Sequence, residues 1–163
     1  MSKKINWGIL GPGKIAKKFA LGLEHVENAN LYAAASRSLE KARDFAEEMG
    51  ADKAYGSYTE MLNDPEVDAI YIATPHVFHH EHTLLCLEHK KAVLCEKPFA
   101  MNKDQVKEMI DFAQKQDTFL MEAMWTHFLP HFKYTKEVIK SGKYGKVLAM
   151  EADFGFDAPF NAN

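Results

Sequence analysis

The segment INWGILGPGKIAKKFALGL, residues 5–23, decides the fold. A short apolar run ends at Gly11, and apolar residues then recur at helical spacing after Gly13. This pattern predicts a strand, a tight turn and a helix, with the G-x-G-x-x-A spacing of a dinucleotide-binding turn. Gly11 permits the turn, Gly13 leaves room for a pyrophosphate at the helix N-terminus, and Ala16 allows the helix to pack closely on the strand. A purely structural glycine turn is the alternative interpretation.

The alternation of strand and helix continues to residue 122, which favours the dinucleotide interpretation. Several of the expected strands are continuous apolar runs, as in a parallel sheet that is covered on both faces. We therefore predict an α/β fold, a Rossmann doubly wound parallel sheet, over residues 1–122. The expected strands are 5–10, 31–35, 53–55, 68–73, 92–95 and 118–122, and the longer helices follow residues 13, 38, 77 and 102.

After residue 122 the pattern changes. Residues 125–140 have the spacing of one longer helix, which Gly142 would end. Residues 146–156 alternate with a period of two, as expected of a half-exposed antiparallel strand. We expect residues 123–163 to begin a second domain that is incomplete, so that the chain is part of a longer protein.

The overall composition excludes several classes of function. The formal net charge is −3 with acids and bases interspersed, which does not indicate a nucleic-acid interface. No apolar run has transmembrane length, and the apolar stretch near the N-terminus is too short for a signal peptide. We expect a cytoplasmic protein with no membrane partner. The two cysteines lack metal or redox spacing, and Cys95 is predicted to be buried and reduced.

The residues that follow the second strand indicate which dinucleotide binds. An NAD site usually carries an acid there, which accepts from the ribose 2′-hydroxyl and would repel a 2′-phosphate. This chain has Ser36 and Arg37 instead, and hydroxyl and guanidinium groups bind phosphate. We predict NADP rather than NAD. The alternative is a solvated arginine beside the helix cap at Ser38.

The stretch LCEKPF, residues 94–99, places a charged pair where a buried strand ends. Ligands bind outside the carboxyl ends of the strands in this kind of sheet. Lys97 would stabilise the charge that develops on a substrate oxygen during reduction, or take up the hydroxyl proton during oxidation. Glu96 would orient the lysine, and Pro98 is predicted to follow a cis bond. An ordinary exposed charge pair is the alternative.

Four histidines between residues 76 and 82 raise the question of a metal site. No cysteine or carboxylate completes a recognisable ligand set, so we predict no metal. We expect His79 to line the pocket and His80 and His82 to be solvated. Glu122, at the end of a strand, is expected to help shape the site.

Four segments resemble the glucose-fructose oxidoreductase/inositol dehydrogenase/rhizopine catabolism (Gfo/Idh/MocA) family of NAD(P)-dependent sugar dehydrogenases. Glu96-Lys97-Pro98 is the most specific of the family's motifs. The final segment is most similar to the subgroup of dimeric dihydrodiol dehydrogenases and NADP-dependent D-xylose dehydrogenases. The segments are WGILGPGKIA (7–16), YIATPHVFHHEH (71–82), AVLCEKPFAMN (92–102) and FLMEAMWTHFLP (119–130).

The resemblance implies an enzyme that transfers a hydride between NADP and a sugar or cyclic diol. It implies a following α+β domain with an open mixed sheet that forms a homodimer, and a second catalytic group beyond residue 163. Lys97 with Glu96 would be catalytic. His76 and His127 depart from the family pattern, and a non-catalytic cofactor-binding sensor is the rival. The implied cofactor contacts are Gly11, Gly13, Lys14, Ile15, Ala16, Ser36, Arg37, Thr74, Pro75, His79, Glu96, Lys97 and Trp125.

Overall fold

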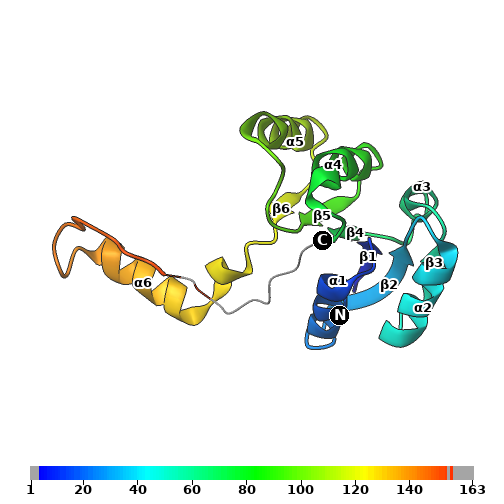
Figure 1. Cartoon of the computed structure of the whole chain (residues 1–163), viewed down its shortest axis with the longest axis horizontal. Coiled ribbons are helices and arrows are strands. Elements are labelled where there is room, and N and C mark those ends of the chain that lie inside the picture. The colour runs from blue at the N-terminus through cyan, green and yellow to red at the C-terminus, as the bar shows by residue number, and fades with distance from the viewer. Residues whose placement is uncertain (1–3, 154, 156–163) are drawn as a thin grey trace. The chain divides into compact units, whose positions relative to one another are not determined.

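The structure is a computed structural model, and it describes residues 4–153 and residue 155. The chain divides into two compact units, residues 1–124 and residues 125–163. The first unit contains a single six-stranded sheet with helices packed on it (Figure 1). Each unit is described by itself below.

The six strands run parallel in the order β3-β2-β1-β4-β5-β6. The order reverses between β1 and β4, which is the switch point where a doubly wound sheet opens a crevice for ligands. The predicted doubly wound parallel sheet is confirmed. The strands are β1 (Ile5–Leu10), β2 (Ala29–Ala35), β3 (Lys53–Tyr55), β4 (Ala69–Ile72), β5 (Ala92–Cys95) and β6 (Leu120–Glu122).

The strand register brings the predicted site residues to one edge of the sheet. Leu10 pairs with Ala35 on one side and with Ile72 on the other. Ile72 pairs in turn with Cys95, and Cys95 with Glu122. All these residues end their strands, so the residues that follow them share the carboxyl edge, namely residues 11, 36, 73, 96 and 123.

Helices cover both faces of the sheet (Figure 1). Successive side chains of a strand point to opposite faces, so Ile9 packs in one core cluster and Leu10 in the other. The cluster of Ile9 includes residues of α1 and α2, and the cluster of Leu10 includes residues of α3, α4 and α5. The helices are α1 (Lys14–Leu23), α2 (Leu39–Met49), α3 (Tyr58–Leu62), α4 (His79–Glu88, after a 3-10 turn at His76–Phe78) and α5 (Lys103–Lys115).

Local capping residues set several helix ends. The Ser38 hydroxyl accepts from the backbone N–H of Lys41 at the start of α2, and Asn102 caps α5 in the same way. Gly50 ends α2 in the left-handed conformation, with φ of 75°. At the start of α1, which leads away from the glycine turn, Gly13 is the N-cap and no side chain caps the helix.

In the second unit, the single helix predicted over residues 125–140 was wrong. A 3-10 turn, Trp125–Phe128, comes first, and the helix α6 (Pro130–Ser141) follows it. Leu129 is extended, with ψ of 138°, because the residue before a proline avoids the helical region. Pro130 then begins α6, and Gly142 ends it as predicted.

The strand predicted over residues 146–156 is also wrong for the part that the structure describes. Residues 146–153 and residue 155 have no regular secondary structure. A strand needs a neighbour to satisfy its backbone groups, and no described strand of this unit offers one. Residues 154 and 156 lie outside the described residues.

Candidate functional site

The glycine turn after β1 is shaped for a close ligand. Gly11 has φ of 91°, and a Cβ there would lie 2.6 Å from the Thr74 Cγ2 atom, so a side chain would be strained and would clash. A Cβ at Gly13 would meet no atom within 4 Å, so the start of α1 opens on free space. Ala16 is fully buried against the sheet. The uncapped N–H groups and the room before α1 fit a diphosphate.

Thr74, the residue that meets Gly11, is held on two sides by histidines. Its hydroxyl lies 3.0 Å from Nδ1 of His82, and its carbonyl oxygen lies 2.9 Å from Nε2 of His79. The other nitrogen of His79 lies 2.8 Å from the carbonyl oxygen of Pro98. His79 is fully buried and joins the turn after β4 to the loop that carries Lys97. Its observed contacts are internal, and its expected contact with a cofactor stays a prediction.

The loop that follows β5 is fixed along its backbone. The Glu96 carboxylate accepts from the Tyr71 hydroxyl at 2.5 Å and from the backbone N–H of Lys97 at 3.1 Å. The backbone N–H of Phe99 donates to Glu122 at 3.1 Å. Glu96 therefore holds the Lys97 backbone, whereas we expected it to orient the lysine side chain. The Lys97–Pro98 peptide bond is cis, as predicted.

The Lys97 side chain differs from its backbone in having no protein partner. It is exposed, and no hydrogen bond or ion pair joins its ammonium group to another residue of the described part. The loop thus presents one free cation on a fixed backbone.

Cys95, the last residue of β5, is buried and free, as predicted. Burial raises the pKa of the Cys95 thiol to about 12, so it stays a neutral thiol beside the loop.

Tyr71 is a residue of this site that the sequence did not reveal. It lies within the apolar run of β4 and stacks on Phe19, with ring centroids 3.9 Å apart. Burial, and then the hydrogen bond to Glu96, raise the pKa of Tyr71. The hydroxyl therefore stays protonated and donates a hydrogen bond to the Glu96 carboxylate. The only signal in the sequence is a tyrosine inside a buried strand, which needs a partner for its hydroxyl.

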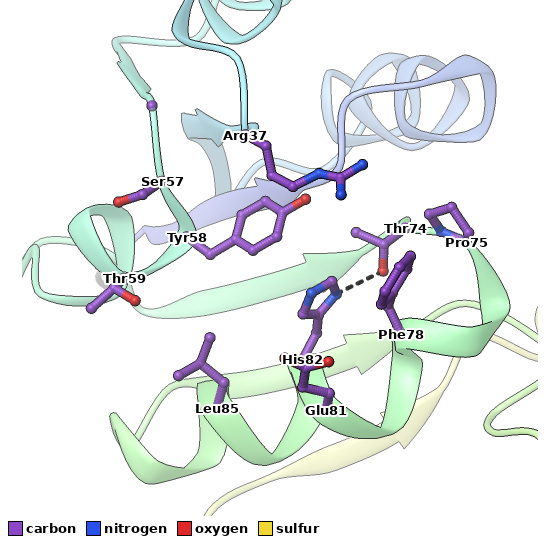
Figure 2. A pocket seen from close by; sticks show the side chains of 11 residues that line it. Arg37, Ser57, Tyr58, Thr59, Thr74, Pro75, Phe78, Glu81, His82 and Leu85 are labelled. Atoms are coloured by element: carbon purple, nitrogen blue, oxygen red, sulfur yellow. Dashed lines mark hydrogen bonds between the residues drawn. The ribbon is translucent and has the colours of Figure 1, made fainter.

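A cavity of about 460 Å³ lies between the carboxyl ends of β2 and β4, the turn before α3, and the first turns of α4 (Figure 2). Arg37 and Phe78 both line it, with the guanidinium carbon 6.0 Å from the ring centroid. The lining residues are Arg37, Gly56, Ser57, Tyr58, Thr59, Thr74, Pro75, Phe78, Glu81, His82 and Leu85.

His82 forms part of this cavity, and the prediction that it is solvated was wrong. His82 is only 8% exposed. The ring stacks on Phe78, with centroids 5.5 Å apart, and meets Tyr58 edge-on at 4.8 Å. Burial lowers the pKa of His82, so the ring is neutral at neutral pH. The sequence placed His82 on a polar helix turn, but Tyr58, the first residue of α3, packs against its ring.

The end of β2 offers cationic and hydroxyl groups and no carboxylate. The Ser36 hydroxyl accepts from the backbone N–H of Ser38 at 3.3 Å, so its own proton is free to donate. Arg37 is exposed at the edge of the cavity and has no ion-pair partner among the described residues. These groups are suited to an anion beside the cavity.

Residues 5–124 match a family model described as "Oxidoreductase family, NAD-binding Rossmann fold". The chain belongs to the Gfo/Idh/MocA oxidoreductase family. Its resemblance to the dihydrodiol dehydrogenase subgroup is also confirmed. Trans-1,2-dihydrobenzene-1,2-diol dehydrogenase from Mus musculus is 43% identical over 155 residues, which cover 94% of this chain and 46% of that relative. The Homo sapiens protein of the same name is 39% identical over 93% of this chain and 46% of its own length.

Two solved structures of similar proteins share the fold. An NAD binding oxidoreductase from Klebsiella pneumoniae is 30% identical, with a TM-score of 0.82 over 87% of this chain and 40% of its own. A 3-ketoreductase from Actinomadura kijaniata in complex with NADP is 28% identical, with a TM-score of 0.80 over 88% of this chain and 46% of its own. The chain thus spans less than half the length of these relatives.

The other cofactor contacts implied by the family resemblance lie in different parts of the structure. Lys14 and Ile15 are exposed in the first turn of α1, and Pro75 is exposed at the rim of the cavity. Trp125 belongs to the second unit, where it is 60% exposed, so its contact with the cofactor stays a prediction. In the described part, no three potential metal ligands cluster together, and no helix is long and apolar enough to cross a membrane.

Proposed function

We propose that this chain carries the cofactor-binding part of an NADP-dependent dehydrogenase, which transfers a hydride between nicotinamide and a CH–OH or C=O carbon of a sugar or cyclic diol. Lys97 is the proton donor or acceptor in this proposal. The observation that carries it is the free Lys97 ammonium on a fixed loop, at the same edge of the sheet as the glycine turn.

The choice of NADP rests on the end of β2. Arg37 offers a guanidinium without an ion-pair partner at the rim of the cavity, and Ser36, the residue before it, offers a free hydroxyl proton. A carboxylate at the end of β2 would disfavour a 2′-phosphate. The two solved relatives include one named for NAD binding and one in complex with NADP, so the family accepts both dinucleotides. The residues of this chain favour the phosphorylated one.

The chain's own groups divide the chemistry between them. The glycine turn and the start of α1 would hold the pyrophosphate. When bound, the nicotinamide supplies or accepts the hydride. In the reductive direction the carbonyl carbon gains a hydride, the C=O electron pair moves to oxygen, and Lys97 gives that oxygen its proton. The oxidative direction is the reverse of these steps. Glu96 and Tyr71 keep the loop in place throughout.

The substrate class follows from the relatives and not from a pocket in this unit. The relatives at about 40% identity are named for trans-1,2-dihydrobenzene-1,2-diol. A cyclic diol and an aldose both present a CH–OH carbon beside further hydroxyls, so both classes are candidates. We further propose that residues 123–163 begin the domain that completes the substrate site and forms a homodimer.

The test combines binding with turnover. NADPH and NADH are titrated separately, and we expect NADPH to bind at least about tenfold more tightly, because a charge-assisted phosphate contact contributes about 1.5–3 kcal/mol. The native protein at its natural length is then assayed with NADP, trans-1,2-dihydrobenzene-1,2-diol and D-xylose. NADPH binding without turnover across a panel of sugars and diols would indicate a sensor. Failure to bind either dinucleotide would overturn the proposal.

A further inference from the structure

We propose that His82 is a specificity-determining residue of the cavity, which recognises the purine of a dinucleotide by donating one hydrogen bond from Nε2. This inference rests on the proposed function, since it names a contact within the cofactor site. It assigns a role to a residue that the family motifs leave undefined.

The first observation is that the Nδ1 side of the ring is fixed. Thr74 is buried, and its hydroxyl has one hydrogen-bond partner in the described part of the chain, Nδ1 of His82 at 3.0 Å (Figure 2). If Nδ1 accepts from the hydroxyl, the Thr74 proton is satisfied and the ring proton lies on Nε2. The opposite tautomer leaves the Thr74 proton buried without an acceptor, which is unfavourable. The neutral ring therefore carries its proton on Nε2.

The second observation is that Nε2 is unpaired in a residue that is more than nine-tenths buried. No hydrogen bond joins Nε2 to another described residue. Among the described residues, the only fully buried side-chain nitrogen or oxygen without a partner is Thr83 Oγ1, so Nε2 is reachable by solvent. His82 lines the cavity, and a ligand in the cavity can supply the missing acceptor.

The third observation is that aromatic rings hold the imidazole in one plane. Phe78 stacks on His82 with an interplanar angle of 22°, and Tyr58 meets it at 74°. In Figure 2 the Tyr58 hydroxyl points toward Arg37 and away from the histidine. A flat heteroaromatic ring can pack on such aromatic side chains and present its edge to a polar group. The cavity volume of about 460 Å³ accommodates a nucleoside.

The fourth observation is the position of the cavity in the sheet. It reaches from the residues that follow β2 and β3, Arg37 among them, across to those that follow β4, whereas Lys97 follows β5, one strand further along the sheet. In a doubly wound sheet each half of the dinucleotide lies over one half of the strands. The hydride-transferring ring belongs near Lys97, so the ring that reaches His82 is the purine. Its ring nitrogens are acceptors and match the Nε2–H donor.

The experiment measures the adenosine half alone, with no reaction involved. Adenosine 2′,5′-bisphosphate is titrated calorimetrically into the wild-type chain, His82→Phe and His82→Gln. The phenylalanine keeps a stacking ring and loses both nitrogens, and we expect its affinity to fall about fivefold to tenfold, as for one hydrogen bond. The glutamine amide reaches the Nε2 position and is expected to recover part of the loss. Nicotinamide mononucleotide is the control, and its affinity should not change.

A spectroscopic measurement keeps the inference testable if a variant fails to fold. In the wild type, ¹⁵N spectra should show the ring proton of His82 on Nε2, and the Nε2 resonance should move when adenosine 2′,5′-bisphosphate binds. Unchanged affinity in folded His82→Phe, or an Nε2 resonance that does not respond, would overturn the inference and leave NADP binding intact. Absence of any binding to the wild type would count against the proposed function itself.

Discussion

Two polar regions of the first unit use charge in opposite ways. At the carboxyl edge of the sheet, Arg37 and Lys97 have no ion-pair partner among the described residues. In the loop that leads into β4, Asp64 accepts from Lys53 at 2.8 Å and from Tyr55 at 2.5 Å. We refer to Asp64 and the residues that bind it, Lys53, Tyr55, Tyr32 and Lys91, as the Asp64 cluster.

The charged groups of the Asp64 cluster find their hydrogen-bond partners within the protein. Burial opposes ionisation of Asp64, but the hydrogen bonds from Lys53 and Tyr55 outweigh it and hold the pKa of the carboxyl well below its usual range. Burial and the bond to Asp64 raise the pKa of Tyr55 to about 12. The buried Lys91 ammonium donates to the carbonyl oxygens of Asp64 and Val67, each at 2.8 Å. Each charge in the cluster therefore has its partner inside the protein.

At the carboxyl edge, the contacts within the protein hold the backbone of the Lys97 loop but leave the charged side chain without a partner. The Lys97 loop is tied through Glu96, Pro98 and Phe99, while its ammonium stays free. A charge that is paired internally stabilises the fold, and a charge that is held in place but unpaired is available to a ligand. The contrast predicts that substitutions at the carboxyl edge change turnover or cofactor binding, whereas substitutions in the Asp64 cluster change the free energy of unfolding.

The largest expected effect comes from Lys97→Met in the native protein at its natural length. Loss of a positioned proton donor should lower kcat about 10²-fold to 10⁴-fold. The free energy of unfolding should change by less than about 0.5 kcal/mol, because the side chain is exposed. Lys103→Met, an exposed lysine at the start of α5, is the matched control and should keep its turnover. A Lys97→Met enzyme with most of its turnover would remove the proposed catalytic role.

The next effect is on stability and belongs to the Asp64 cluster. Asp64→Asn removes the carboxylate that accepts from Lys53 and Tyr55, and it should lower the free energy of unfolding by about 2 kcal/mol. NADPH affinity should not change. Chemical denaturation measures the free energy of unfolding, and fluorescence titration measures the NADPH affinity. Asp44→Asn, at an exposed position of α2, is the control. Equal stability of the two variants would show that the cluster contributes nothing.

The Asp64 cluster also has a pH signature. The pKa of Asp64 is lowered in the folded state, so its contribution to stability is complete above the unfolded value of 3.8 and is lost as the pH falls below it. Asp64→Asn should reduce that acid sensitivity.

A smaller effect is expected on cofactor choice. Arg37→Ala should weaken NADP binding about tenfold, because one charge-assisted contact to the 2′-phosphate is lost. NAD binding should stay within about twofold, since that dinucleotide lacks the phosphate. Separate titrations of NADPH and NADH measure both. Arg43→Ala, an exposed arginine on α2, controls for general charge. If Arg37→Ala retains its preference for NADPH, the NADP assignment fails.

The smallest effect concerns His82. Burial lowers the pKa of His82 in the folded state. Below the ordinary value of 6.5 the unfolded chain therefore binds more protons than the folded one, and the free energy of unfolding decreases as the pH is lowered. His82→Phe should show a shallower decrease. Denaturation curves at pH 7.5 and 5.5 for both proteins isolate this residue from the other histidines. Identical slopes would mean that His82 is not buried as a neutral ring.

Much of the fold follows from short-range patterns in the sequence. Periodicity places the strands and helices, because it reflects which face of each element is buried. Gly11 and Gly50 have the positive φ angles that their positions require, and Ser38 caps a helix from one residue before it. The glycine turn and the Lys97 loop are brought together simply because parallel strands end at the same edge.

The sequence by itself thus determined the doubly wound sheet, the glycine turn and the edge at which Lys97 lies, since these depend on neighbours along the chain. Only the tertiary structure decided the roles of the buried polar groups. Tyr71 meets Glu96 across 25 positions, and Asp64 meets Tyr55 and Lys91 from separate elements. His82 is buried where Phe78 and Tyr58, the first residue of α3, pack against its ring. A polar side chain has no periodic signature, and its partner is set by packing between elements that are distant in sequence.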